Sequence, residues 1–377
     1  MPAIYLDCNA TTPLDPEVRE VLLYYYGDGY GNEGSRTHEF GTRAKQAVQK
    51  ARDQIAAVVA AQRDEIIFTS GATESNNLAI LGLAEAGKAQ GKRHLVTTTI
   101  EHKAVLEPFA KLELDGFEVT RLPVSSCGYV EPELVMAALR PDTLLLSIMQ
   151  VNNETGIKQH ISEIAEMLVD HPVFFHTDAA QGFCKDLDTL KNHRIDLISV
   201  SGHKIHAPMG VGALVVRRRG YERPPIHALA YGGGQERGIR PGTLPVALIA
   251  ALGKAAEVAV RDNVKQRESC KVFRDRALVA LMPFNPKFTG NQSRVMEHVL
   301  NISFGELDSE ALIVQLKDLI AISNGSACTS SSYTPSHVLK AMGMSDDEAN
   351  SCVRISWCHM TPEVDWDAVA ERIKRLI

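Results

Sequence analysis

A lysine follows directly after an apolar, β-branched run in the middle of the chain. The run at residues 196–200 predicts a buried strand, and Ser201, Gly202, His203 and Lys204 come next. Lysine is rarely buried without a partner, and burial disfavours its ammonium form. An unprotonated amine can attack an aldehyde and form a Schiff base, while Ser201 and His203 can donate to a phosphate. The four residues suggest a site for pyridoxal phosphate (PLP), although a solvated loop lysine is the alternative.

A glycine turn opens a predicted helix after another apolar strand. Residues 66–69 form the strand, and Ser70, Gly71, Ala72 and Thr73 follow it. Free N–H groups and the positive end of the helix dipole make such a turn a phosphate site. Ala72 could offer one backbone N–H and Thr73 its hydroxyl. The simpler alternative is that Ser70 or Thr73 caps the helix.

Four further polar residues follow predicted strands and suit a PLP ring. Asp178 could pair with the pyridine nitrogen and keep it protonated, which makes the ring a stronger electron sink. Gln181 could donate to the phenolic oxygen of the ring. His102 could stack on the ring and transfer protons, and Asn153 could bond a substrate carboxylate or the phenolic oxygen. Taken singly, each is also explained by an ordinary structural role such as a cap or a turn.

The elements that must position these residues alternate between strand and helix. This alternation predicts an α/β fold with a mostly parallel sheet and helices on both of its faces. Functional residues of such sheets gather beyond the carboxyl ends of the strands, so we expect the candidate residues on one rim. The predicted strands cover residues 65–69, 94–98, 118–123, 143–150, 173–176, 196–200 and 212–216.

The second half of the chain contributes a cysteine and an arginine. A short apolar run at residues 319–323 enters the Gly- and Ser-rich stretch 324–332, whose composition is typical of an exposed loop. Cys328 within it is interpreted as a thiolate nucleophile, with an incidental exposed thiol as the alternative. Arg354 lies in an alternating, strand-like segment, where its guanidinium could bind a substrate carboxylate through two hydrogen bonds. A surface salt bridge is the alternative for Arg354.

Two domains are expected, because 377 residues exceed a usual single core. We place a large α/β domain at residues 13–260 and a smaller α+β domain at residues 261–377, which carries the Cys328 loop. Residues 1–12 are expected to pack with the smaller domain. Helices are predicted at residues 15–26, 42–61, 72–90, 103–116, 131–139, 162–170 and 245–262.

Composition and charge limit the possible partners. A net charge of −6 argues against a nucleic-acid surface, and no run approaches the ~20 apolar residues of a membrane span. The basic runs 217–219 and 374–375 are interpreted as solvated ends of elements. No signal peptide is recognised, and seven cysteines without a CxxC pair predict no disulfide framework and a cytoplasmic location. Cys352, Cys358 and His359 lack a second ligand pair, so no metal site is expected.

Taken together, the motifs resemble those of the cysteine desulfurases, PLP-dependent enzymes of the class V aminotransferase family with the fold type I architecture. The resemblance covers essentially the whole chain. The Gly-Ser-Ala-Cys sequence at residues 325–328 is similar to the branch with the longer cysteine loop, which acts in iron–sulfur cluster assembly and RNA thiolation. The matching segments are residues 6–12, 69–74, 101–103, 152–156, 177–181, 201–204, 232–236, 240–243 and 325–328.

The resemblance implies a role for each candidate residue. Lys204 would bind PLP covalently and later act as a base. Arg354 and Asn153 would bind the carboxylate of L-cysteine. Thr243 would reach the phosphate of the neighbouring subunit, which implies a homodimer with a shared active site. Cys328 would take the sulfur as a persulfide, release L-alanine and pass the sulfur to acceptor proteins. The ring and phosphate of PLP would be held by Ala72, Thr73, His102, Asn153, Asp178, Gln181, Ser201 and His203.

Two motifs depart from the pattern of the family. Glu33 and Gly34 stand where Pro-Ser is usual, and Pro241 stands where the family has Ser. Pro241 fixes its own φ and removes a backbone donor, so its loop should keep its shape and lose one hydrogen bond. Both variants resemble the desulfurases of DNA phosphorothioation systems.

Three alternative functions remain at this point. They are a selenocysteine lyase, a PLP aminotransferase of the same fold and a non-catalytic sulfur-carrier scaffold. Cys328 argues against an aminotransferase, which has no use for that thiol. The intact set of Lys204, His102 and Asp178 argues against a scaffold.

Overall fold

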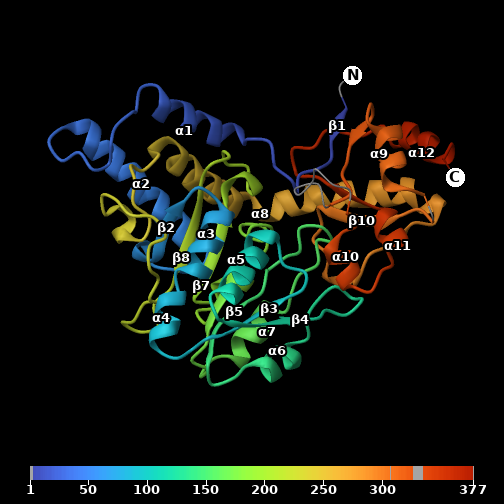
Figure 1. Cartoon of the computed structure of the whole chain (residues 1–377). Helices are drawn as coiled ribbons and strands as arrows, with labels where there is room; N and C mark the ends of the chain where they lie inside the picture. Colours follow the sequence, from blue (N-terminus) through green and yellow to red (C-terminus); the bar gives the residue numbers. More distant parts are fainter. Residues whose placement is uncertain (1–2, 306, 326–333, 377) are drawn as a thin grey trace.

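A seven-stranded sheet forms the centre of the computed structural model, which describes residues 3–305, 307–325 and 334–376 (Figure 1). The strand order is β2-β8-β7-β6-β5-β3-β4, and β8 runs antiparallel to both of its neighbours while the other pairs are parallel. The predicted α/β fold with a mostly parallel sheet is confirmed, and each predicted strand overlaps an observed one. The strands are β2 (Ile66–Thr69), β3 (His94–Thr98), β4 (Glu118–Leu122), β5 (Thr143–Ser147), β6 (Phe174–Asp178), β7 (Leu197–Ser201) and β8 (Gly212–Val216).

Alternation along the strands divides the side chains of the sheet between two hydrophobic clusters. In β2, for example, Ile66 and Phe68 belong to one cluster and Ile67 to the other. The first cluster includes residues of α2 (Glu39–Val58), α7 (Ile161–Met167) and the first half of α8 (Val246–Leu281). The second includes residues of α3 (Ala72–Leu81) and α5 (Lys103–Leu114). Helices therefore cover both faces of the sheet, and its strands are buried on both sides except at the edge strand β4.

The helix predicted over residues 72–90 is interrupted. It forms two helices, α3 and α4 (Ala84–Ala89). At the break, the carbonyl of Gly82 accepts a hydrogen bond from the N–H of His227 at 2.9 Å, and a Cβ on Gly82 would lie 2.7 Å from Cγ2 of Ile226. A segment from far along the chain thus passes too close to Gly82 for a side chain, and local sequence carries no sign of that contact.

One long helix, α8, joins the two parts of the molecule. The sequence predicts a helix at residues 245–262, whereas α8 continues to Leu281. Its first half contributes Ile249 and Leu252 to the core beside the sheet, and its last turns contribute Ala277 and Leu281 to a separate cluster. Figure 1 shows α8 crossing from the sheet to the C-terminal elements. Although α8 has 36 residues, neither it nor another helix in the described part of the chain is apolar enough to cross a membrane.

The C-terminal elements form a small antiparallel sheet with helices packed on it. Its strand order is β12-β10-β9. The N-terminal segment joins this part, because β1 pairs in parallel with β11, and Asp7 bridges to Ser356 at the end of β12. Figure 1 shows β1 and α12, the first and last elements of the described chain, in this part of the molecule. The elements are β1 (Ile4–Tyr5), β9 (Lys287–Phe288), β10 (Val299–Ser303), β11 (Ile320–Ala321), β12 (Cys352–Ser356), α9 (Ser309–Leu316), α10 (His337–Ala341), α11 (Asp346–Asn350) and α12 (Trp366–Lys374).

The domain division at residue 260 stays a prediction, since the boundary falls inside α8. Two helices complete the larger part of the molecule, α1 (Pro16–Tyr26) and α6 (Pro132–Ala138). The helix α1 begins where the sequence indicates, with the Asp15 side chain accepting a hydrogen bond from the N–H of Glu17 at 2.8 Å and Pro16 in its first turn.

The interpretation of the basic run at residues 217–219 as a solvated end of an element is wrong for Arg217. Arg217, expected in solvent, is 2% exposed at the end of β8. Its guanidinium donates to the carbonyls of Leu190 at 2.7 Å, Asn192 at 2.6 Å and Ile195 at 3.1 Å, and also to that of Val59. This arginine therefore satisfies carbonyl groups at the edge of the sheet, which burial would otherwise leave without partners.

Candidate active site

A cavity of about 420 Å³ lies at the carboxyl ends of the parallel strands β2, β3, β5, β6 and β7. Thr243 lies outside this cavity, and Cys328 falls outside the described residues. The structure brings the other candidate residues together from segments spread over most of the chain. They are Ala72, Thr73, His102, Asn153, Asp178, Gln181, Ser201, His203, Lys204 and Arg354.

Lys204 ends a short 3₁₀ turn, Gly202–Lys204, directly after β7. Its Nζ donates to the main-chain carbonyls of Asn9 at 2.5 Å and Ala10 at 2.7 Å. The strand before it is buried along its whole length between β6 and β8, so the sheet determines where the lysine emerges. The amine is held at the cavity wall by the N-terminal segment, and the solvated-loop alternative is wrong.

The N-terminus of α3 opens into the cavity beside β7. Gly71 precedes the helix with φ 152° and ψ −177°, a backbone conformation that residues with side chains rarely adopt. Among the described residues no side chain caps this terminus, so the expected alternative of capping by Ser70 or Thr73 is not observed. The first N–H groups of the helix and its dipole are thus available to an anion. Ser201 contributes a hydroxyl 3.6 Å from the place of a Cβ on Gly71.

Asp178 and Gln181 keep hydrogen-bonding capacity after their protein contacts are counted. The Oδ2 atom of Asp178 accepts from Nδ2 of Asn76 at 2.7 Å, and Oδ1 accepts from the N–H of Ala180 at 2.9 Å. A carboxylate has about four lone-pair positions, so Asp178 can accept a further bond from a ring nitrogen. Gln181 donates from Nε2 to the carbonyl of Asn9 at 2.9 Å and retains its second N–H.

Two histidines at the cavity are held as neutral rings. His102 is the N-cap of α5, and its Nδ1 accepts a hydrogen bond from the N–H of Ala104 at 3.1 Å. Burial lowers the pKa of His102. Burial and the neighbouring Lys204 lower the pKa of His203 to about 4, and its Nδ1 lies 3.1 Å from Oγ1 of Thr11. At neutral pH both rings can therefore donate a hydrogen bond without carrying charge.

Arg354 is buried, with 2% of its surface exposed. The alternative interpretation of Arg354, a surface salt bridge, is therefore wrong. Its Nη2 pairs with Oδ1 of Asp7 at 2.5 Å, and its Nη1 donates to the carbonyls of Asn153 at 2.9 Å and Gly325 at 3.4 Å. Its buried Nε has no partner among the described residues. The guanidinium thus lines the cavity while holding the N-terminal segment, the loop after β5 and Gly325, near the start of the stretch that carries Cys328.

Two residues that organise the site were not identified from the sequence. Asn9 accepts from Lys204 and Gln181 through its carbonyl, and its Nδ2 donates to the carbonyl of Asn153 at 3.1 Å. Asn76 orients Asp178. Asn76 stands among polar neighbours in the first half of α3, so the sequence carries no signal that singles it out. Asn9 acts mostly through its main chain, which side-chain patterns do not report.

The segment that carries Thr243 is anchored beside α3. Arg240 donates from Nε to Oε1 of Glu74 at 2.8 Å, and the N–H of Gly242 donates to Oε1 of Gln235 at 2.8 Å. Thr243 itself is exposed on the surface of the chain. Any contact between Thr243 and a phosphate must therefore be made outside the cavity of its own chain.

The chemistry of the cavity fits PLP. Its volume of about 420 Å³ lies within the roughly 300–1,000 Å³ typical of small-molecule sites. It offers an amine on Lys204, an uncapped helix N-terminus for a phosphate, and a carboxylate on Asp178 that can accept one more bond. The remaining N–H of Gln181 and the neutral ring of His102 complete a set of groups that matches the polar and aromatic parts of the cofactor.

The chain belongs to the aminotransferase class-V family, whose profile matches residues 4–369. Enzymes of this family depend on PLP. Within the family the chain belongs to the cysteine desulfurases. It is 45% identical over 377 residues to "Cysteine desulfurase IscS" of Serratia proteamaculans, an alignment that covers 99% of this chain and 92% of that protein. The resemblance seen in the sequence is confirmed.

Two solved structures extend this comparison. The crystal structure of DndA from Streptomyces lividans is 48% identical, covers 93% of this chain and 98% of its own, and superposes with a TM-score of 0.83. The structure of SspA in complex with cysteine is 36% identical, covers 96% of this chain and all of its own, and has a TM-score of 0.84. A relative with this fold therefore binds cysteine.

Proposed function

We propose that the chain is a cysteine desulfurase that converts L-cysteine to L-alanine and passes the sulfur to acceptor proteins. The observation that carries this proposal is the position of Gly325, whose carbonyl lies 3.4 Å from Nη1 of Arg354. Cys328 follows three residues later, and three extended residues span at most about 10 Å. A thiol at residue 328 can therefore reach a substrate whose carboxylate is bound by Arg354.

The residues of the cavity position the reactants. Bound PLP would supply an electron sink for the bonds at the α-carbon of the substrate. Asp178 would keep a proton on the pyridine nitrogen, and the start of α3 with Thr73, Ser201 and His203 would hold the phosphate. Lys204 and His102 would move protons at the substrate carbons.

The sulfur step uses a thiolate of the chain. The Cys328 thiolate would attack the sulfur of L-cysteine, forming a sulfur–sulfur bond while the carbon–sulfur bond of the substrate breaks. The electron pair of the broken bond stays with the substrate carbon, which takes up a proton, and L-alanine leaves. Cys328 then carries a persulfide, which an acceptor thiol can attack.

A homodimer with a shared active site is part of the proposal. Thr243 is exposed and lies outside the cavity of its own chain, so it would act on the phosphate of a partner subunit.

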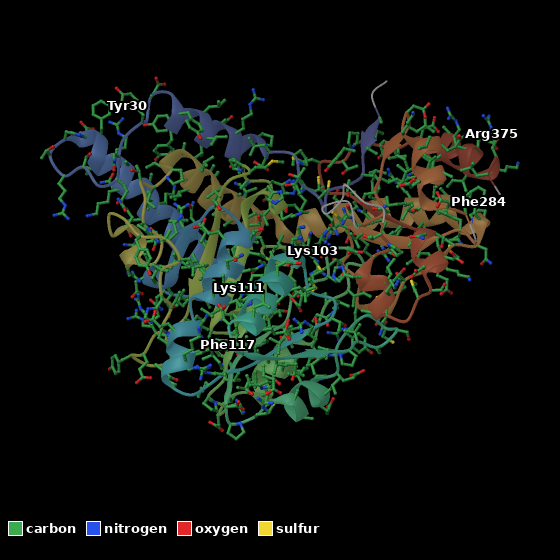
Figure 2. The ribbon with its side chains drawn as sticks, in the orientation of Figure 1. Tyr30, Lys103, Lys111, Phe117, Phe284 and Arg375 are labelled. Carbon is green, nitrogen blue, oxygen red and sulfur yellow. The ribbon has the colours of Figure 1, made fainter. Side chains whose placement is uncertain are left out.

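Exposed aromatic residues support an interface on the α1–α2 side. Tyr26 is 64% exposed, Tyr30 is 61% exposed, and the ring of Tyr30 lies 5.2 Å from that of Phe40. Figure 2 shows Tyr30 at the end of the molecule away from Arg375. Contiguous exposed apolar groups are typical of interaction surfaces.

The destination of the sulfur is proposed from the resemblance. Iron–sulfur cluster assembly, tRNA thiolation and DNA phosphorothioation are the three candidates, and the variants Glu33, Gly34 and Pro241 favour the last. In each case the sulfur would go to a partner protein, without direct contact to nucleic acid. A cytoplasmic location is proposed because seven cysteines without a CxxC pair suit a compartment in which thiols stay reduced.

The test compares the purified parent holoenzyme with Cys328→Ala, using L-cysteine and a reductant. The parent should release alanine and sulfide in equal amounts. Cys328→Ala should keep the visible absorption of its cofactor, and borohydride should still fix the cofactor to Lys204, while sulfide release falls by at least about 100-fold. The matched control is Cys127→Ala, a half-buried cysteine outside the cavity, which should behave as the parent.

Three outcomes would redirect the assignment. Sulfide release by Cys328→Ala at the parent rate would show that another group takes the sulfur. Amino-group transfer to a 2-oxo acid, unaffected by Cys328→Ala, would identify an aminotransferase. A strong preference for selenocysteine over cysteine would identify a lyase.

A further inference from the structure

A second group of reactive side chains lines a small cavity of about 50 Å³, which is separate from the active-site cavity. It is formed by the N-terminal segment, the end of β12 and the middle of α8. Cys8 and Cys358 line this cavity, and they are 2% and 8% exposed, respectively. The catalytic cavity contains neither of them. The proposed desulfurase reaction does not use either thiol.

Backbone and side-chain bonds fix both cysteines on neighbouring segments. The N–H of Cys8 donates to the carbonyl of Ser356 at 3.0 Å, and the next residue, Asn9, donates its N–H to Oγ of Ser356 at 2.9 Å. The N–H of Cys358 donates to Oγ1 of Thr361 at 2.9 Å. These anchors place both side chains in the lining of one cavity of about 50 Å³, where each thiol shifts the pKa of the other.

The surroundings make the two thiols unequal. The interaction between the two thiols lowers the pKa of Cys358 and raises that of Cys8. The N–H of Met360, the hydroxyl of Thr361 and the charge of Lys185 also favour a Cys358 thiolate. A thiolate that shares a small cavity with a second thiol is the arrangement of a nucleophile with its resolving cysteine.

Other cysteines near this cavity lack these features. Cys270 lines the same cavity, but burial raises its pKa. Burial likewise raises the pKa of Cys184. Cys358 has in addition an approach from outside, because it also lines an open groove of about 600 Å³ along α8, together with Lys265 and Phe273. An oxidant in that groove meets the more nucleophilic thiol of the pair.

We propose that Cys8 and Cys358 form a reversible dithiol–disulfide site, separate from the catalytic Cys328. The oxidant is a low-molecular-weight disulfide such as oxidised glutathione. The Cys358 thiolate attacks one of its sulfurs, forms a mixed disulfide and releases one thiolate. Cys8 loses its proton to that thiolate, and its sulfur attacks the sulfur of Cys358 and releases the second thiolate. Two protein thiols are oxidised, and one small disulfide is reduced to two thiols.

The site joins two segments that both reach the active site. Cys8 precedes Asn9, whose carbonyl accepts from Lys204 and Gln181. Cys358 follows β12, which carries Arg354. A bond between the two cysteines would tie the N-terminal segment covalently to the end of β12. The inference does not depend on the proposed desulfurase activity, since it concerns thiols outside the catalytic cavity.

The test is disulfide mapping of the holoenzyme in glutathione buffers of increasing oxidised fraction. Samples are quenched with acid, alkylated and digested with trypsin, which places Cys8, Cys358, Cys352, Cys270 and Cys184 in separate peptides. We expect a Cys8–Cys358 linked peptide pair that rises with the oxidised fraction and disappears on treatment with dithiothreitol. Mapping of the parent sequence needs no variant, so a folding defect cannot obscure the result.

Two variants sharpen the assignment. Cys8→Ser should abolish the linked pair and leave Cys358 as a glutathione mixed disulfide. Cys270→Ser, the matched control in the same cavity, should leave the linked pair at the parent yield. The proposal is overturned if Cys358 stays unmodified where Cys127 is fully modified. It is also overturned if Cys358 links to Cys270 as readily as to Cys8.

Discussion

Glu101 shows how strongly this fold perturbs a single residue beside the site. Its carboxyl group is fully buried next to His102, where Oε1 accepts from the hydroxyl of Thr98 at 2.7 Å and from the N–H of Met149 at 3.0 Å. Its Oε2 has no hydrogen-bond partner within the described part of the chain. Burial, the largest cause, raises the pKa of Glu101 to about 8. Glu101 is therefore protonated at neutral pH in the folded protein.

This raised pKa predicts a specific dependence of stability on pH. In the unfolded chain the pKa returns to its ordinary value of 4.5, so between pH 4.5 and about 8 only the folded state keeps the proton. The free energy of unfolding contributed by Glu101 is then present at low pH and lost as pH rises, by up to about 1.4 kcal/mol per pH unit. Glu101→Gln should lose this dependence, so its stability relative to the parent should rise from pH 5.5 to pH 8. Urea unfolding at several pH values measures the difference, and a difference independent of pH would contradict the assignment.

At the scale of elements, the two helices that begin at the cavity start in different ways. The first turn of α3 follows Gly71 and is left without a side-chain cap, whereas α5 is capped by His102. An uncapped terminus suits an anionic ligand. A histidine used as a cap must keep Nδ1 unprotonated, which places the proton of the neutral ring on Nε2. The helix start therefore sets the tautomer of the proposed proton-transfer residue.

This dual role of His102 can be separated by two substitutions. Asn is a good N-cap and cannot transfer protons, whereas Ala can do neither. His102→Asn and His102→Ala should both reduce kcat by roughly 100- to 10,000-fold. His102→Ala should in addition be less stable than His102→Asn by about 1 kcal/mol. Steady-state kinetics and denaturant unfolding measure the two effects. Equal stability of the variants would show that the cap contributes nothing.

Local sequence patterns predict the strands and the polar residues at their ends, but they do not predict contacts between residues that are far apart in the chain. The strands are predictable because buried parallel strands are continuous apolar runs, and Asp178 and Lys204 are recognisable because polar residues at strand ends interrupt that pattern. The break at Gly82 depends on Ile226 and His227, and Asn9 meets Lys204 across 195 residues. The burial of Arg217 depends on carbonyls of two distant segments, at Val59 and at residues 190–195. Such contacts have no local signature, so the partners of the site residues emerge only from the fold.

At the scale of the whole molecule, α8 and the N-terminal segment bind the two parts into one unit. The helix contributes to one hydrophobic cluster beside the large sheet and to the separate cluster of the C-terminal part. Leu6 lies in that C-terminal cluster, while Asn9 reaches the cavity. Figure 2 shows that Lys103, at the start of α5, lies between the sheet and the C-terminal elements. Lys103 and Ser336 line one groove, so the two parts meet beside the cavity. Among the candidate residues that the structure describes, Thr243 is the one that lies outside the cavity.

A mixed-dimer experiment decides whether Thr243 serves a partner subunit. Lys204→Ala removes the lysine of a subunit's own cavity, and Thr243→Glu places a carboxylate where the phosphate of the neighbouring cavity would bind. Each variant alone should be nearly inactive. After subunit exchange, a heterodimer combines an intact Lys204 from one chain with an intact Thr243 from the other, so one native site forms. We expect activity to reappear on mixing, up to about a quarter of the parent value. Random exchange makes half of the dimers mixed, and each mixed dimer has one native site of two.

The control mixes Lys204→Ala with Asp178→Asn, two residues of the same cavity, and should restore nothing beyond what Asp178→Asn shows alone. If the first mixture stays inactive although mass spectrometry detects heterodimers, Thr243 does not act across the interface.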